Sequence, residues 1–208
     1  MKVITTFHTS SSVVASVAGH LTNDSSLRHL IVGYSDRLVV YSAQPDGLRQ
    51  ECVTEIWGRL MSLKILPRES KPDRLLLLTD HPEPQLIVLS YDPGANTLDR
   101  DLHLNLTERN ARVSEFFHDV AVSPLGDIAV VSCYSGKLRA VRLVGKSNAN
   151  ELDQTIPEFN LISLAFVSTD EDEDTYALAF LYLDHQNKRQ LISPSRLPRS
   201  PLQTRYRS

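Results

Sequence analysis

His118 and Asp119 are neighbouring residues whose types could take part in acid–base chemistry. A histidine held by a carboxylate is half of the Ser–His–Asp arrangement that activates a hydrolytic nucleophile. The sequence has no Gly-x-Ser-x-Gly segment or comparable frame to present that nucleophile. We therefore interpret His118 as a structural histidine, and we keep catalysis by His118 or Asp119 as an alternative.

The histidines and cysteines are not spaced as metal ligands. No His-x-x-x-His pair occurs, and Cys52 and Cys133 form no Cys-x-x-Cys pair. We expect no metal or other cofactor, and we expect both cysteines to be buried reduced thiols. The histidines are His8, His20, His29, His81, His103, His118 and His185.

Neither the acidic run nor the glycines have the spacing of a small-ligand site. The acidic run 170–174 lacks the glycine and the spaced oxygen ligands of a calcium loop, so we interpret it as a solvated loop tip. The glycines are scattered singly and form no loop that could cradle a phosphate. We expect no small-molecule substrate.

The charges disfavour direct binding of nucleic acid by most of the chain. The net charge is −3, and residues 193–208 carry four arginines and no acid, which leaves −7 for residues 1–192. An acidic surface repels phosphates. Arg196, Arg199, Arg205 and Arg207, with Tyr206, could contact nucleic acid nonspecifically, but a basic end is more often only solvated.

Composition and length describe an ordinary globular chain. It has 208 residues, of which 41% are hydrophobic, and two cysteines. These values exclude collagen-like, low-complexity and disulfide-rich classes, and the length fits about one domain. No apolar run approaches the ~20 residues that span a bilayer, so we expect no membrane partner. The N-terminus mimics a signal peptide, but polar residues interrupt its apolar stretch.

Short apolar runs bounded by turn residues dominate the sequence, which is typical of strands. We find no convincing helix. The expected strands cover residues 14–18, 29–34, 37–43, 48–56, 60–65, 74–79, 85–91, 97–104, 116–122, 127–134, 137–143, 161–167, 176–183 and 189–192.

The strands recur in an internal repeat. The second strand of each unit begins near His29, Arg74, Asp127 and Tyr176, which are 45, 53 and 49 residues apart. Propeller blades of four antiparallel strands have a period of about 40 to 50 residues. The fold class we predict is therefore all-β, a partial β-propeller of about four blade-like repeats. A generic β-sandwich is the alternative.

The last repeat is incomplete. After residue 192 the chain is rich in Ser, Pro and Arg and has no apolar alternation. Prolines cannot donate to a strand ladder. We expect residues 1–192 to be the N-terminal part of a first β-propeller and residues 193–208 to be a disordered basic tail.

Five segments carry a resemblance to a known family: residues 17–22 (VAGHLT), 30–32 (LIV), 37–41 (RLVVY), 47–49 (GLR) and 57–60 (WGRL). They resemble the opening of large triple-propeller scaffold proteins. This family comprises the large subunits of the damaged-DNA-binding complex, of cleavage and polyadenylation specificity factor, and of splicing factor 3b. Segments 75–79, 86–92, 126–129, 134–138 and 177–183 follow the same order. The similarity covers about residues 10–192, and its spacing looks most like the damaged-DNA-binding subunit.

The resemblance implies a nuclear scaffold that binds other proteins. In the damaged-DNA-binding case, such a scaffold bridges a cullin-RING ubiquitin ligase to substrate receptors and takes part in DNA repair. Family members are several times longer, and only the first four blade-like repeats of their first propeller have counterparts here. The resemblance implies no individual partner-binding residue in this chain. The reason is that the family's receptor-docking surface combines the first and third propellers.

We therefore expect a noncatalytic protein-interaction scaffold whose partners are substrate receptors or complex subunits. Two alternatives remain: a pre-mRNA processing scaffold with nucleic-acid binding, and a propeller enzyme using His118 or Asp119. An open arc of blades also leaves unprotected strand edges. We expect the chain alone to be marginally stable or to self-associate unless a partner completes it.

Overall fold

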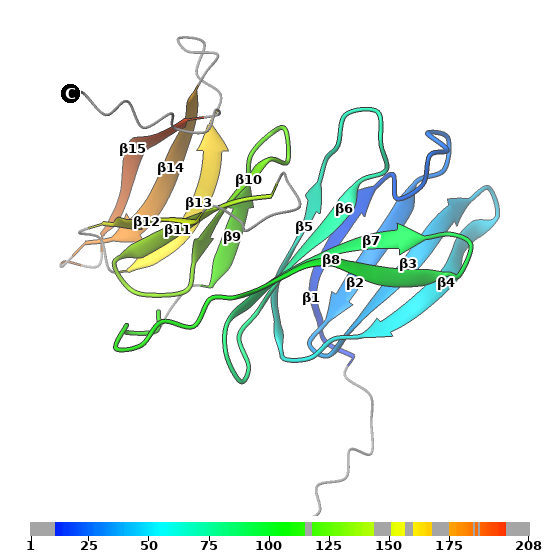
Figure 1. The fold of residues 1–208 in the computed structure, drawn as a ribbon, viewed down its shortest axis with the longest axis horizontal. Helices are drawn as coiled ribbons and strands as arrows, with labels where there is room; N and C mark the ends of the chain where they lie inside the picture. The colour runs from blue at the N-terminus through cyan, green and yellow to red at the C-terminus, as the bar shows by residue number, and fades with distance from the viewer. Residues whose placement is uncertain are drawn as a thin grey trace, which may run out of the picture. The chain divides into compact units, whose positions relative to one another are not determined.

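The computed structural model consists of antiparallel strands joined by short turns and loops (Figure 1). It describes residues 11–114, 118–143, 151–156, 160–167, 175–184, 186 and 188–198. Within these ranges no residue is helical. The strands are β1 (Val13–Gly19), β2 (His29–Tyr34), β3 (Arg37–Gln44), β4 (Gly47–Glu55), β5 (Leu60–Leu66), β6 (Arg74–Thr79), β7 (Gln85–Asp92), β8 (Thr97–Asn105), β9 (Asp119–Val122), β10 (Ile128–Ser132), β11 (Lys137–Arg142), β12 (Glu151–Thr155), β13 (Leu161–Val167), β14 (Thr175–Leu183) and β15 (Arg189–Pro198).

The strands form four sheets, each with its strands in chain order. Three sheets have four strands, β1 to β4, β5 to β8 and β9 to β12, and the fourth contains β13 to β15. All neighbouring strands pair antiparallel, as in propeller blades. First strands of consecutive sheets contact each other, β1 with β5 and β9 with β13. The predicted all-β partial propeller is confirmed.

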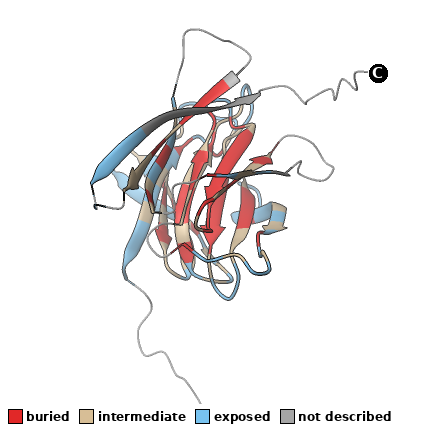
Figure 2. Cartoon of the chain, turned by 90° about the vertical axis from the view of Figure 1, so that its left-hand side faces the viewer, coloured by how far each residue is buried: buried red, intermediate tan, exposed pale blue. Residues whose placement is uncertain are grey.

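The chain divides into two compact units, Met1–Arg109 and Asn110–Ser208. The first holds β1 to β8 and the second β9 to β15. Figure 2 shows that the buried residues are concentrated in the strands and that the connecting loops are mostly exposed.

The core of the first unit lies between its two sheets. In β6 the residues Leu75, Leu76, Leu77 and Leu78 are all buried, so this strand is covered on both faces. Burial on both faces explains why its sequence is a continuous apolar run rather than an alternating one. Ile31 and Leu60 belong to the same core.

The second unit has its own core. Val130 of β10, Leu164 of β13, and Leu178 and Phe180 of β14 are buried together. The rings of Phe166 and Tyr176 pack edge to face with centroids 5.5 Å apart. Each unit thus buries apolar surface contributed by two sheets.

The expected strands occur, most with ends shifted by one to three residues, and two places differ more. Residues 116 and 117 of the expected strand 116–122 lie outside the described residues. The strand β12 was not expected, because its residues show no apolar run. The expected tail at 193–208 begins inside β15, which continues to Pro198. The ladder tolerates Pro194 because β15 ends its sheet and because the register shifts between Leu178 and Phe180, opposite this proline. Residues 199–208 lie outside the described residues.

Candidate functional site

His118 and Asp119 lie at the start of the second unit's first strand. The His118 Nε2 atom is 3.0 Å from the carbonyl oxygen of Ser114, so this ring nitrogen donates a hydrogen bond to the backbone. Asp119 begins β9 and pairs with Ser132 of β10. A backbone acceptor fixes the orientation of the ring, which is the ordinary role of a structural histidine.

The other histidines are dispersed. His20 Nδ1 is 3.3 Å from the carbonyl oxygen of Leu27, and His103 Nε2 is 3.0 Å from Oε1 of Gln85. In the described part of the chain, no group of three or more His, Cys, Asp or Glu side chains could hold a metal ion. His8, His185 and the acidic run 170–174 lie outside the described residues, as do Arg199, Arg205, Tyr206 and Arg207.

The two cysteines are free and buried, as expected. Cys52 lies in β4, and burial raises the pKa of its thiol. Cys133 follows β10 in the second unit. For the described residues, no helix has the length and the hydropathy needed to cross a membrane.

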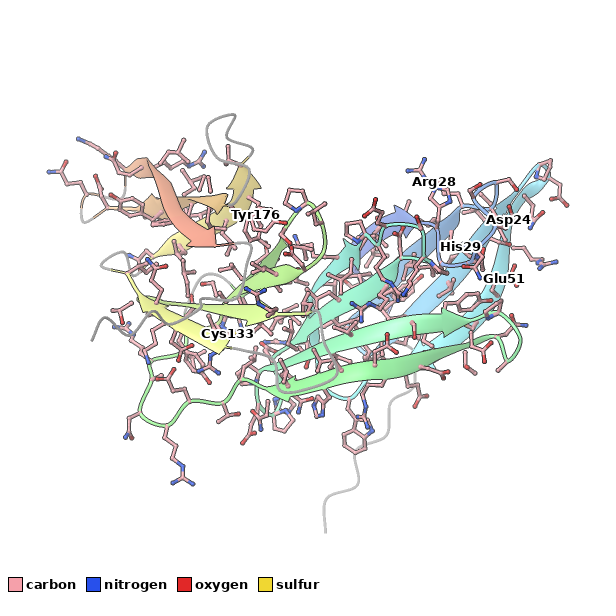
Figure 3. All side chains as sticks on the ribbon, turned by 45° about the horizontal axis from the view of Figure 1, so that its top comes forward. Asp24, Arg28, His29, Glu51, Cys133 and Tyr176 are labelled. Carbon is pink, nitrogen blue, oxygen red and sulfur yellow. The ribbon has the colours of Figure 1, made fainter. Side chains whose placement is uncertain are left out.

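A polar cluster in the first unit was not anticipated from the sequence. His29 of β2 pairs across the sheet with Ser42 of β3. The ladder between β3 and β4 pairs Val40 with Cys52 and Tyr41 with Gln50, so Glu51 is an inserted residue. A bulge of this kind redirects a side chain. The Ser42 hydroxyl donates to Oε1 of Glu51 over 2.5 Å. His29 and Glu51 of this cluster are labelled in Figure 3.

Hydrogen bonds and burial shift the pKa values of Glu51 and His29 in this cluster. The hydrogen bond from Ser42, followed by that from Arg49 Nε at 3.0 Å, lowers the pKa of Glu51. Burial lowers the pKa of His29, whose Nδ1 atom is buried without a hydrogen-bond partner. The ring of Tyr91 from β7 lies 5.6 Å from that of His29. The cluster therefore ties the two sheets of the first unit together.

A hollow of about 340 Å³ lies at the tip of the hairpin between β3 and β4. Its lining residues are Gln44, Asp46, Gly47, Leu48 and Arg49. Gln44 Nε2 donates to the Ser42 hydroxyl at 3.2 Å, which connects the hollow to the polar cluster.

The loop from β4 to β5 presents Trp57 to solvent. Trp57 is 89% exposed, which is unusual for the largest apolar side chain. The backbone N–H of Ile56 donates to the Asp36 carbonyl and that of Leu60 donates to the Ser35 carbonyl, both at 2.9 Å. These bonds hold both sides of the loop against the turn between β2 and β3.

A second set of contacts holds the same loop against the turn after β6. Gly58 has a φ of +105°, and a Cβ there would lie 2.5 Å from the carbonyl oxygen of His81. Arg59 forms a bidentate ion pair with Asp80, with Nε 3.0 Å from Oδ1 and Nη2 2.5 Å from Oδ2. The backbone around Trp57 is thus fixed on two sides while its indole stays exposed.

The adjoining turn carries exposed polar groups. His81, Pro82 and Glu83 are exposed. Glu83 Oε2 accepts hydrogen bonds from Asn105 Nδ2 at 2.8 Å and Thr107 Oγ1 at 2.9 Å, and these bonds lower its pKa. We call the exposed residues Asp36, Glu55, Trp57, Arg59, His81, Pro82 and Glu83 the Trp57 surface. One sequence signal could have indicated the Trp57 surface. It is a tryptophan beside a glycine and charged residues, in a segment between two strands.

Comparison with known proteins gives a family match and a similar protein. A family model described as the RSE1/DDB1/CPSF1 first beta-propeller matches residues 12–194. DNA damage-binding protein 1 from Caenorhabditis elegans is 24% identical over 179 residues. The aligned part covers 86% of this chain and 15% of that protein. The chain therefore corresponds to a small part of this relative.

Proposed function

Because the chain belongs to the RSE1/DDB1/CPSF1 first β-propeller family, we propose that it is a noncatalytic protein-interaction scaffold. It would resemble the adaptor subunit of a cullin-RING ubiquitin ligase in DNA damage repair. The family match across residues 12–194 carries this proposal, and the similarity to a DNA damage-binding protein favours the repair role. Its partners would be substrate receptors or complex subunits, and its location the nucleus.

The same match supports a proposal about domain organisation. It runs through both compact units, which divide after Arg109. We propose that both units are blades of one propeller domain. Each unit would then supply two blades, in agreement with its two sheets.

Affinity purification of the tagged chain from cells, with and without nuclease treatment, tests the scaffold proposal. We expect defined protein partners at constant stoichiometry that remain bound after nuclease treatment. Recovery of the chain without partners would refute the proposal. Partners that are all released by nuclease would refute direct protein binding.

A pre-mRNA processing scaffold is the second candidate, because the family description names CPSF1 beside DDB1. This candidate requires contact with nucleic acid, and phosphate contacts weaken as salt rises. Filter binding of single-stranded RNA at two salt concentrations tests it. Strong, salt-sensitive retention would favour this candidate over the adaptor role.

The enzyme alternative concerns His118 and Asp119. Purified protein would have to show a hydrolytic activity that His118→Ala and Asp119→Ala abolish. We expect no such activity, because the observed contact of His118 Nε2 is with a backbone carbonyl.

A further inference from the structure

We propose that the Trp57 surface docks a basic segment of a protein partner, with an arginine or lysine side chain stacked on the indole. This inference rests on the proposed scaffold function and specifies where one partner binds and by what chemistry. It uses only residues of the first unit.

Trp57 is an exposed aromatic side chain of the kind that contributes strongly to binding. Tryptophan and arginine are the residue types most enriched among those that dominate binding energy at protein interfaces. Gly58 and the Arg59–Asp80 ion pair fix the backbone beside Trp57. A partner therefore has little loop entropy to remove when it covers the ring, and a preorganised aromatic group binds at lower cost.

Acidic groups outnumber basic groups around Trp57. We count the charges of the Trp57 surface together with the ion-pair partners Asp80 and Arg37. These residues contain four carboxylates, those of Asp36, Glu55, Asp80 and Glu83. They contain two guanidinium groups, and each already has an acidic neighbour: Arg59 pairs with Asp80, and Arg37 lies 3.2 Å from Asp36. The balance is −2, from four negative and two positive groups. A cation is therefore the complementary ligand.

The face of the exposed indole ring attracts cations. Cations bind over tryptophan more strongly than over other aromatic side chains. The chain makes this kind of contact nearby, since the Arg37 guanidinium carbon lies 4.3 Å from the centroid of the Tyr34 ring. Nucleic-acid bases also stack on exposed aromatics. The carboxylates of Glu55 and Glu83 would repel the phosphates of such a ligand, so a basic peptide fits better.

The chain has one tryptophan, so its intrinsic fluorescence reports on Trp57 alone. The first experiment compares quenching by caesium and iodide ions, with N-acetyltryptophanamide as the reference. We expect caesium to be the relatively stronger quencher, and we expect the double variant Glu55→Gln, Glu83→Gln to remove this preference. A preference for iodide in the unmodified chain would contradict the proposed charge.

The second experiment measures binding of three labelled probes by fluorescence anisotropy. They are a Gly/Ser peptide with several arginines, the same peptide with glutamates, and a single-stranded oligothymidylate. We expect saturable binding of the arginine peptide only. Trp57→Ala should weaken it at least tenfold, about the loss expected for an interface hot spot. Preference for the oligonucleotide or the glutamate peptide would overturn the proposal.

Leu48→Ala is the matched control. Leu48 is also an exposed apolar residue, but it lies at the other end of β4 from Trp57. At about 3.3 Å per residue, the seven steps along β4 from Leu48 to Glu55 span roughly 23 Å, and Trp57 lies beyond Glu55. We expect Leu48→Ala to change the affinity for the arginine peptide less than twofold. An equal loss in both variants would contradict a site at Trp57.

Affinity purification of the Trp57→Ala variant separates failure of this inference from failure of the proposed function. We expect the variant to lose at least one partner that the unmodified chain retains after nuclease treatment. If the variant keeps every partner, the docking inference is wrong and the scaffold function stands. If the unmodified chain has no partner, the scaffold function itself fails.

Discussion

At the scale of single residues, the cluster around His29 links burial to ionisation. His29 is 2% exposed, and its neighbours include the carboxylate of Glu51 and the ring of Tyr91. Burial disfavours the charged imidazole and outweighs the attraction of Glu51, so the pKa of His29 is lowered. Protonation of this one side chain should therefore oppose folding.

We predict that His29 makes the protein less stable as the pH falls below about 6.5, the ordinary pKa of an exposed histidine. Because the folded-state pKa is lower, the unfolded chain binds the proton first, and stability is lost as the pH decreases. Urea unfolding of the unmodified chain and of His29→Leu between pH 7.5 and 5.5 checks this. The loss should be smaller in the variant, and equal losses would disprove the assignment.

Gly58 permits the backbone that presents Trp57. Its φ of +105° is strained for other residues, and a Cβ would approach the His81 carbonyl oxygen. We predict that Gly58→Ala lowers the free energy of unfolding by about 3 kcal/mol. Chemical denaturation measures this change.

Gly47→Ala is the control for backbone strain alone. Gly47 has a φ of +135°, but a Cβ there would meet nothing within 4 Å. We expect a cost of about 1 kcal/mol. Equal costs for the two substitutions would show that the approach to His81 does not matter.

The environments of some single residues could be predicted from the sequence, and those of others could not. Cys52 and Cys133 were expected to be buried reduced thiols because they lie far apart and form no Cys-x-x-Cys pair, and both are free and buried. The contact between Ser42 and Glu51 could not be predicted, because it depends on a bulge that shifts the register by one residue. The exposure of Trp57 was not predicted, because apolar character alone predicts burial. From the sequence, we used this residue only as part of the family resemblance.

At the scale of elements, a turn in the second unit is tied to a strand of the next sheet. The Ser123 hydroxyl donates to Oδ1 of Asp127 at 2.6 Å and accepts from the backbone N–H of Ile128 at 3.0 Å. The hydroxyl of Tyr176, in β14, donates to the same carboxylate at 3.0 Å. The turn between β9 and β10 is thus joined to a neighbouring sheet by one carboxylate.

We predict that Tyr176→Phe destabilises the protein by about 1 to 2 kcal/mol, because it removes a half-buried hydrogen bond to a charged group. The phenyl ring still packs against Phe166. Tyr91→Phe removes a hydroxyl bonded to the exposed Asn96 side chain and should cost less than about 0.5 kcal/mol. Unfolding free energies of the two variants provide the comparison, and the reverse order would contradict the assigned role of Asp127.

Most strands could be predicted because their sequences alternate or are continuously apolar. The expected bounds of β2, β6 and β13 equal the observed ones. β12 was missed because it is polar and is held by pairing with β11 and by the Arg139–Asp153 ion pair. β15 was predicted too short because proline argues against a strand unless an edge or a bulge accommodates it.

At the scale of the whole molecule, the repeat of 45 to 53 residues was the sequence feature that predicted the arrangement of strands into sheets. It indicated blades, and the structure places four strands in three of the sheets and three in the last. The division into two compact units was not predicted, because length alone favoured one domain. Contacts between sheets depend on side-chain packing, which the strand pattern does not specify.

We predict that the isolated chain self-associates. Val13 and Val14 in β1 and Val167 in β13 are exposed apolar side chains, and exposed apolar surface favours association. Among the described residues, no strand pairs with the outer edge of β15. Sedimentation velocity should show an average mass that rises with concentration.

A double variant, Val13→Thr and Val14→Thr, should reduce this association, and Val53→Thr is the matched control. Val53 is similarly exposed but lies in the outermost strand β4. A monomer at every concentration, with one sharp thermal transition, would contradict the prediction.

Native mass spectrometry of the nuclease-treated complex purified from cells tests most directly whether this chain acts by binding other proteins. We expect a discrete heteromeric assembly of fixed stoichiometry that contains this chain and no nucleic acid. The chain alone, or only as copies of itself, would contradict this function.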